Sequence, residues 1–176
     1  REGISPAQAV PVAREILALK GVRLLGIGTN LTCFGGVLPG PENMARLAQT
    51  ASEVEAALGI ELEVVSGGNS SSVDMLEKGA LPGRINQLRF GEAILFGTEF
   101  AYGRRIERTF NDAFQLHAEI IELKEKPSVP FGEIGLDAFG KKPVFVDRGV
   151  RRRAILGIGK QDVILDTLRP VDPGVF

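Results

Sequence analysis

An amphipathic helical pattern between two short apolar runs constrains the fold of this chain more than any other feature. From Pro41 to Leu58, apolar residues recur at the three- and four-residue spacing of one helix face. The run "VRLLGIGTN" comes before this pattern and "LEVV" comes after it, and each suits one short buried strand. A strand, a helix and a strand in this order predict a parallel strand pair joined by a helical crossover.

The alternation of helix and strand extends over the first hundred residues. "SPAQAVPVAREILALKG" predicts a helix with Ser5 as N-cap, Pro6 at the first helical position and Gly21 as terminator. Pro11 lacks an N–H donor, so it predicts a kink or a later start of this helix. Further along, "SSVDMLEKG" predicts a short helix and "INQLRFGEAILFG" a strand and turn. The whole order, α-β-α-β-α-β, is typical of a parallel sheet with helical crossovers.

The pattern changes after about Arg108. Apolar and polar residues then alternate, which predicts a half-buried antiparallel strand through Phe114, Leu116, Ala118 and Ile120. Further short strands are predicted for "KPVFVD", "RRAILGIG" and "DVILD", which Gly, Pro and Asp separate. The sequence therefore predicts an α/β domain over residues 1–108 and a β-domain over residues 109–176.

Composition excludes several classes of function. The 176 residues are 44% hydrophobic and 24% charged, as in a soluble globular protein. The net charge of −1 predicts no nucleic-acid partner, and no apolar run is long enough to predict a membrane span. One histidine, His117, and one cysteine, Cys33, predict no metal site and no internal disulfide, which fits a cytoplasmic protein. With no base placed beside it, Cys33 is predicted to be a buried small residue rather than a nucleophile.

Two successive turns carry the chemistry of an anion site. "SGGNSSS" offers glycines and small hydroxyls after one strand, and "LRFGEA" places Arg89 and Gly91 after the next. Ligands of parallel α/β folds bind beyond the carboxyl ends of the strands, so both turns predict a phosphate site. The alternatives are ordinary N-capping by Ser70 or Ser71 and a surface salt bridge for Arg89.

Several longer motifs resemble a known family. "GIGTNLTCFGG", "VSGGNSSS", "LRFGEAILFGTE", "HAEIIELKEKPSVPFGEIGLDAFG" and "AILGIGKQDV" together resemble the amino-acid racemases of the alanine racemase superfamily, closest to the ornithine racemase-like branch. The resemblance covers essentially the whole chain. It implies an enzyme that depends on pyridoxal 5′-phosphate, with a (β/α)8 barrel followed by a β-domain. Residues 1–108 would then be the second half of the barrel, and residues 109–176 a β-domain incomplete at its C-terminus.

The resemblance implies a cofactor site at the two turns. Asn69 and Ser70, with Ser71 beside them, match the pair that holds the cofactor phosphate, and the backbone N–H groups of Gly91 and Glu92 match the other half of the cradle.

Three further residues acquire roles from the same resemblance. Arg89 matches the arginine that donates to the pyridine nitrogen, and a permanently charged donor cannot protonate that nitrogen. The ring is then a weaker electron sink, which favours reprotonation of the substrate. Asn30 takes the place of a histidine beside the cofactor ring. Arg1 matches an arginine near the substrate carboxylate.

The catalytic pair departs from the family pattern. None of the seven lysines matches the lysine that holds the cofactor covalently, which would precede Arg1. We therefore expect a fragment that is inactive in isolation. The catalytic tyrosine position is Phe131, and Tyr102 lies outside the motif. Asp137 or Glu133 is a candidate second base; the alternatives are solvated loop acids or a carboxylate that binds the amine of a dibasic substrate.

The predicted function is that of an amino-acid racemase, an isomerase that is a head-to-tail homodimer when intact. Ornithine, alanine, lysine and serine all stay open as substrates. The alternative is a non-catalytic protein that binds pyridoxal phosphate, although such carriers lack a C-terminal β-domain.

Overall fold

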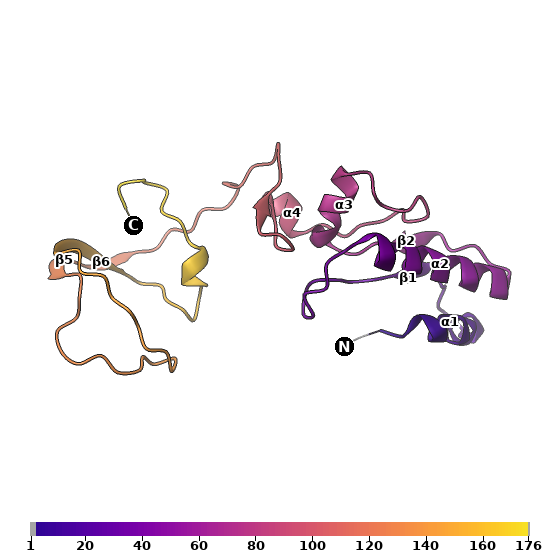
Figure 1. The fold of residues 1–176 in the computed structure, drawn as a ribbon, viewed down its shortest axis with the longest axis horizontal. Coiled ribbons are helices and arrows are strands. Elements are labelled where there is room, and N and C mark those ends of the chain that lie inside the picture. Colours follow the sequence, from indigo (N-terminus) through magenta and orange to yellow (C-terminus); the bar gives the residue numbers. More distant parts are fainter. Residues whose placement is uncertain (1–2, 176) are drawn as a thin grey trace. The chain divides into compact units, whose positions relative to one another are not determined.

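The computed structural model describes residues 3–175 and divides the chain into two units, residues 1–114 and 115–176 (Figure 1). In the first unit β1 (Gly26–Gly28) and β2 (Val64–Ser66) pair in parallel, with Ile27 opposite Val65. Helix α2 (Pro41–Leu58) connects the two strands. The predicted parallel pair with a helical crossover is therefore confirmed.

The core of the first unit lies between α2 and the strand pair. Pro41 begins α2, and the N–H of Gly40 before it donates to Asn43 Oδ1 at 2.9 Å. The buried face of α2 packs with residues of α1 and of the β2 region, and the cluster comprises Ala9, Ala13, Leu47, Ala51, Val54, Leu62 and Val65. No helix among the described residues is both long and apolar enough to cross a bilayer.

The first helix begins later than its N-cap pattern predicts. A 3-10 turn, η1 (Pro6–Gln8), precedes α1 (Ala9–Ala18), and the Ser5 N–H donates to Gln8 Oε1 at 3.1 Å. Pro11 therefore lies in the first turn of α1. The N–H groups of a first turn have no acceptor within the helix, so the missing N–H of proline costs no helical hydrogen bond there.

The predicted third strand is reduced to one parallel bridge, between Ser66 and Gln87. The prediction of a strand here was wrong, because the Asn86 side chain makes hydrogen bonds to β2 and its flank that the backbone of a third strand would otherwise make. Its Oδ1 accepts the N–H of Val65 at 2.9 Å, and its Nδ2 donates to the carbonyl of Glu63 at 2.8 Å. The segment still runs beside β2, since the Gly67 N–H donates to the Gln87 carbonyl at 2.9 Å.

Short elements surround these strand ends. The first is η2 (Ser70–Ser72), which leads into α3 (Val73–Glu77). Helix α4 (Glu92–Leu95) is followed by β3 (Thr98–Glu99) and β4 (Arg104–Arg105), which pair antiparallel.

The second unit is built on one antiparallel pair, β5 (Ile120–Pro127) and β6 (Val150–Leu156), followed by η3 (Leu165–Thr167) (Figure 1). Strand β6 confirms the prediction for "RRAILGIG". The strand predicted through residues 114–120 was wrong for residues 114–119, because β5 begins only at Ile120, and the strands predicted for residues 142–147 and 162–166 were wrong. Apolar alternation marks segments that could pair, but a strand also needs a neighbour to complete its ladder, and no strand partner for these three lies among the described residues.

One face of this pair is rich in cations. Lys124 lies opposite Arg153 and Lys126 opposite Arg151, and like charges in such positions repel. Glu122 shares the face, since residues two apart in a strand point the same way. Its carboxylate contacts Lys124 at 2.8 Å and also contacts Lys126. The hydrogen bonds from these two lysines lower the pKa of Glu122 from 4.5 to about 2.

We expect Glu122→Gln to remove an acid transition of this strand pair. A carboxyl with a lowered pKa in the folded state stabilises that state above pH 4.5, and this contribution is lost as the pH falls through about 2. Circular dichroism of the full-length protein between pH 5 and pH 2 should show less loss of strand signal for Glu122→Gln than for wild type across that window. The matched control is Glu125→Gln on the same strand. An unchanged profile for Glu122→Gln would contradict the assignment.

Candidate functional site

The structure brings together the two turns that the sequence marks as an anion site. Ser70 Oγ accepts the N–H of Gly91 at 3.3 Å and the N–H of Ala93 at 3.2 Å. Beside this contact lies a cavity of about 500 Å³, and its lining includes six residues predicted for the cofactor: Asn69, Ser70, Ser71, Arg89, Gly91 and Glu92.

Two buried hydroxyl groups at this cavity have a proton to donate and no acceptor. A hydroxyl donates one hydrogen bond and accepts two. Both acceptor positions of Ser70 Oγ are taken by backbone N–H groups, and no described residue accepts its proton. Ser71 Oγ has no partner at all among the described residues. Ser70 and Ser71 are only 7% and 6% exposed. An unsatisfied buried polar group costs about 1–3 kcal/mol, so a ligand with several oxygen atoms would stabilise this site.

Ser72 is different from its two neighbours, because its Oγ donates to the Gly67 carbonyl at 2.7 Å. The capping role falls to Asn69, whose Oδ1 accepts the N–H of Ser71 at 2.8 Å. N-capping is therefore present, but by Asn69 rather than by Ser70 or Ser71. Because Asn69 satisfies the cap, the hydroxyls of Ser70 and Ser71 are left for another partner.

Two glycines give the first turn its shape. Gly68 has φ +106°, a conformation that L side chains rarely adopt. A Cβ at Gly67 would lie 2.8 Å from Ile85 Cγ2, so only glycine lets the turn pack on the next segment. These glycines serve the turn and its packing, whereas a Cβ on Gly91 would meet open space.

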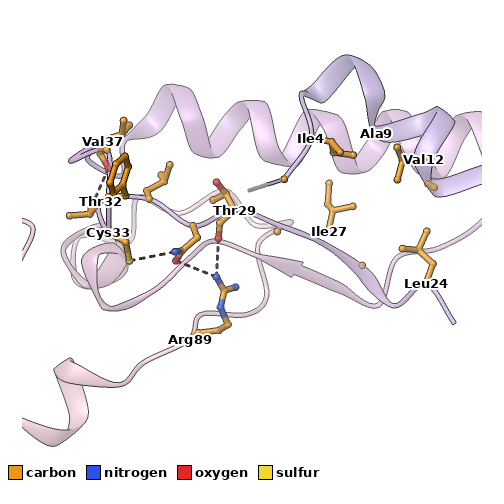
Figure 2. A pocket seen from close by; sticks show the side chains of 18 of the residues that line it. Ile4, Ala9, Val12, Leu24, Ile27, Thr29, Thr32, Cys33, Val37 and Arg89 are labelled. Carbon is orange, nitrogen blue, oxygen red and sulfur yellow. Dashed lines mark hydrogen bonds between the residues drawn. The ribbon is translucent and has the colours of Figure 1, made fainter. Parts of the chain in front are cut away.

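Arg89 is held at the ends of β1 and β2. Its Nη1 donates to Ser66 Oγ. Its Nη2 donates to the Thr29 carbonyl at 3.1 Å and to Asn30 Oδ1 at 3.5 Å (Figure 2). The surface salt bridge considered for Arg89 is absent among the described residues, since no carboxylate there lies within 4.0 Å. Its charge is therefore not compensated by a carboxylate of the described chain.

A larger cavity of about 1050 Å³ lies along α1 and β1 (Figure 2). Ala9, Val12, Leu24 and Ile27 form its apolar part, and Thr32, Cys33 and Arg89 also line the smaller cavity. The prediction that Cys33 is buried was wrong, because the loop that carries it leaves its side chain exposed.

Asn30 connects the two turns, because its Oδ1 accepts hydrogen bonds from Asn69 of the first turn and Arg89 of the second. Its Oδ1 accepts from Asn69 Nδ2 at 2.9 Å, and its own Nδ2 donates to Cys33 Sγ at 3.4 Å. The structure therefore joins Asn30, Asn69 and Arg89 in one network of side chains.

An ion pair that no sequence motif predicts lies at the β3–β4 turn, whose residues Phe100 and Ala101 line the smaller cavity. Glu99 is fully buried, and its Oε1 lies 3.5 Å from Arg104 Nε. Burial raises the pKa of Glu92, and the charge of Glu99 adds to that rise; a hydrogen bond from Thr98 at 3.0 Å opposes it. No local motif in "TEFAYGRR" marks this pair, because only the β3–β4 turn brings the two side chains together.

The remaining predicted residues belong to other parts of the chain. Arg1 is not among residues 3–175. Asp137 belongs to the second unit and is exposed. Hydrogen bonds from the backbone N–H groups of Lys141, at 2.8 Å, and Phe139, at 2.9 Å, lower the pKa of Asp137. Such a carboxylate is a poor proton donor. Glu133 is likewise an exposed residue of the second unit.

Comparison with known proteins identifies the family. Residues 1–99 match the model of the N-terminal domain of alanine racemase. The chain is 49% identical over 173 residues to an ornithine racemase of Acetoanaerobium sticklandii, covering 98% of this chain and 49% of that protein. It is 46% identical over 175 residues to a lysine racemase of Thermotoga maritima, covering 99% of this chain and 49% of that protein.

The chain thus spans about half the length of these curated relatives. No solved structure matches it. The match to the family model covers more than half of the chain, and both relatives align with nearly all of it. This chain therefore belongs to the alanine racemase superfamily, in the branch that contains ornithine and lysine racemases.

Proposed function

We propose that the full-length protein is an amino-acid racemase that depends on pyridoxal 5′-phosphate. The observation that carries this proposal is the pair of buried hydroxyls, Ser70 and Ser71, whose protons find no acceptor among the described residues. Phosphate oxygens accept such hydrogen bonds, and the charged acceptor makes them stronger than neutral ones. The site thus fits the phosphate of the cofactor that this family uses.

Each residue of the site has a part in holding the cofactor. The hydroxyls of Ser70 and Ser71 would donate to the phosphate, and the backbone N–H of Glu92 is the proposed third donor. The N–H groups of Gly91 and Ala93 hold Ser70 Oγ in place at 3.3 and 3.2 Å. When bound, the cofactor supplies an electron sink that makes the α-proton of an amino acid removable.

Arg89 is the proposed donor to the ring nitrogen. Hydrogen bonds to Ser66, Thr29 and Asn30 hold its guanidinium, so its position would be set before a cofactor binds. Since an arginine stays charged, it stabilises the unprotonated ring nitrogen and weakens the electron sink. Rapid return of the proton to Cα, and hence racemisation, is favoured by this arrangement.

For the substrate we propose a dibasic amino acid, ornithine or lysine, with the names of the two relatives as the support. Asp137 stays a proposed contact of the substrate amine rather than a proton donor, given its lowered pKa. We also propose that residues 1–108 are the second half of a (β/α)8 barrel, that residues 109–176 belong to its β-domain, and that the intact enzyme is a homodimer.

Chiral chromatography of the full-length protein with L-ornithine, L-lysine and L-alanine tests this function. With added pyridoxal phosphate, ornithine or lysine should reach a 1:1 mixture of enantiomers, because enantiomers have equal free energies. The matched control starts from the D-enantiomer and should reach the same mixture. Cofactor binding without any turnover would instead identify a binding protein. Absence of cofactor binding would reject both functions.

A further inference from the structure

Cys33 lies beside the proposed phosphate site with an exposed thiol. It lines both cavities, at the end that they share. Two amide groups donate to its sulfur. One is Asn69 Nδ2 at 3.2 Å. The other is Asn30 Nδ2 at 3.4 Å, the dashed line that reaches Cys33 in Figure 2. These two donors hold the sulfur next to the turn that carries Ser70 and Ser71.

The backbone before Cys33 is strained in a way that positions it. Thr32 has φ +71°, which is rare for a β-branched residue, and strain of this kind costs about 1–3 kcal/mol. The turn is maintained by hydrogen bonds from the Thr32 N–H to the Val37 carbonyl at 2.8 Å and from the Gly36 N–H to the Thr32 carbonyl at 2.8 Å. The thiol therefore sits on a fixed turn.

One residue connects the thiol to the phosphate site. Asn69 donates to Cys33 Sγ through Nδ2 and accepts the N–H of Ser71 through Oδ1 at 2.8 Å. Ser71 is 6% exposed, its Oγ has no partner among the described residues, and it lines the same cavity of about 500 Å³ as Cys33. Under the proposed function a phosphate oxygen would accept from the unpartnered Ser71 hydroxyl, so a group attached to Cys33 in the same cavity would compete with that ligand for space.

We propose that Cys33 is a thiol–disulfide exchange site, and that reaction with a small disulfide closes the phosphate site. Cys33 gives its proton to solvent, and Sγ attacks one sulfur of the disulfide. A new S–S bond forms, the original S–S bond breaks, and the second sulfur leaves as a thiolate with the bonding electron pair. Cys33 is thereby oxidised and the leaving half of the disulfide is reduced. This inference rests on the proposed phosphate site but not on the racemisation reaction.

The test treats the reduced full-length protein with glutathione disulfide and locates the modification by peptide mass analysis. We expect one glutathione on Cys33. Inorganic phosphate at ten times its Kd leaves about one site in eleven free, so it should slow the modification about tenfold. The modified protein should lose binding of inorganic phosphate and pyridoxal phosphate, and dithiothreitol should restore both. In the matched control, Cys33→Ser should show the same affinity before and after treatment.

Different outcomes separate this inference from the proposed function. A modification rate that saturating phosphate leaves unchanged, or a modified protein that binds phosphate as before, would overturn the role of Cys33. If inorganic phosphate protects Cys33 while pyridoxal phosphate does not bind, the exchange site stands and the cofactor assignment fails. If pyridoxal phosphate binds equally well to the reduced and the modified protein, the exchange site fails and the cofactor assignment stands.

Discussion

Ser70→Ala is expected to weaken the binding of pyridoxal phosphate by about 10- to 100-fold, since a hydrogen bond to a charged group contributes about 1.5–3 kcal/mol. The substitution removes a donor to the phosphate. It also removes the acceptor for the N–H groups of Gly91 and Ala93, which join the two turns. Fluorescence titration of the full-length protein with pyridoxal phosphate measures the loss of affinity directly.

Ser72→Ala is the matched control for this prediction. Ser72 is fully buried and Ser70 is 7% exposed, but the Ser72 hydroxyl donates to the Gly67 carbonyl and not toward the cavity. We expect Ser72→Ala to reduce the free energy of unfolding by about 1 kcal/mol and to leave the cofactor affinity close to that of wild type. Equal loss of affinity in both variants would mean that Ser70 acts through folding alone, and the assignment of its hydroxyl to the phosphate would be withdrawn.

Arg104→Met should lower the free energy of unfolding by about 3–5 kcal/mol, because it leaves a fully buried carboxylate without its cation. Glu99 would keep hydrogen bonds from the Tyr102 N–H, at 3.2 Å to each oxygen, but no counter-charge. Arg104 also contacts Glu77 at 2.5 Å on α3, so the loss would loosen α3 from the β3–β4 turn. Urea unfolding of the full-length protein at pH 7 measures the change.

The neighbouring Arg105 supplies the control. Arg105 is exposed and donates to the Thr109 carbonyl at 3.1 Å, so Arg105→Met should change the free energy of unfolding by only about 0.5 kcal/mol. Combining Arg104→Met with Glu99→Gln should recover part of the loss, because a neutral amide needs no counter-ion. A result in which Arg104→Met is as mild as Arg105→Met would show that Glu99 does not depend on Arg104.

Cys33 shows why burial is harder to predict than residue type. Its small apolar side chain and lack of a nearby base in the sequence favoured a core position. The backbone at Thr32 instead turns into a left-handed conformation, and the following residue is presented to solvent. Average residue preferences favour burial of such a side chain, and a strained turn closed by hydrogen bonds within residues 32–37 overrides them.

Features whose causes are local could be predicted from the residues alone. Residues close together in the chain predict helix α2, through the period of its apolar residues, and the two strands that flank it. The hydroxyls and glycines of "SGGNSSS" likewise lie close together in the chain. The folded chain was needed to show that Asn69 caps the turn, that Ser70 contacts Gly91 and that Glu99 pairs with Arg104. It also showed that residues 142–147 form no strand. Each of these outcomes depends on which partner is near in space, and residue spacing along a single segment does not encode that partner.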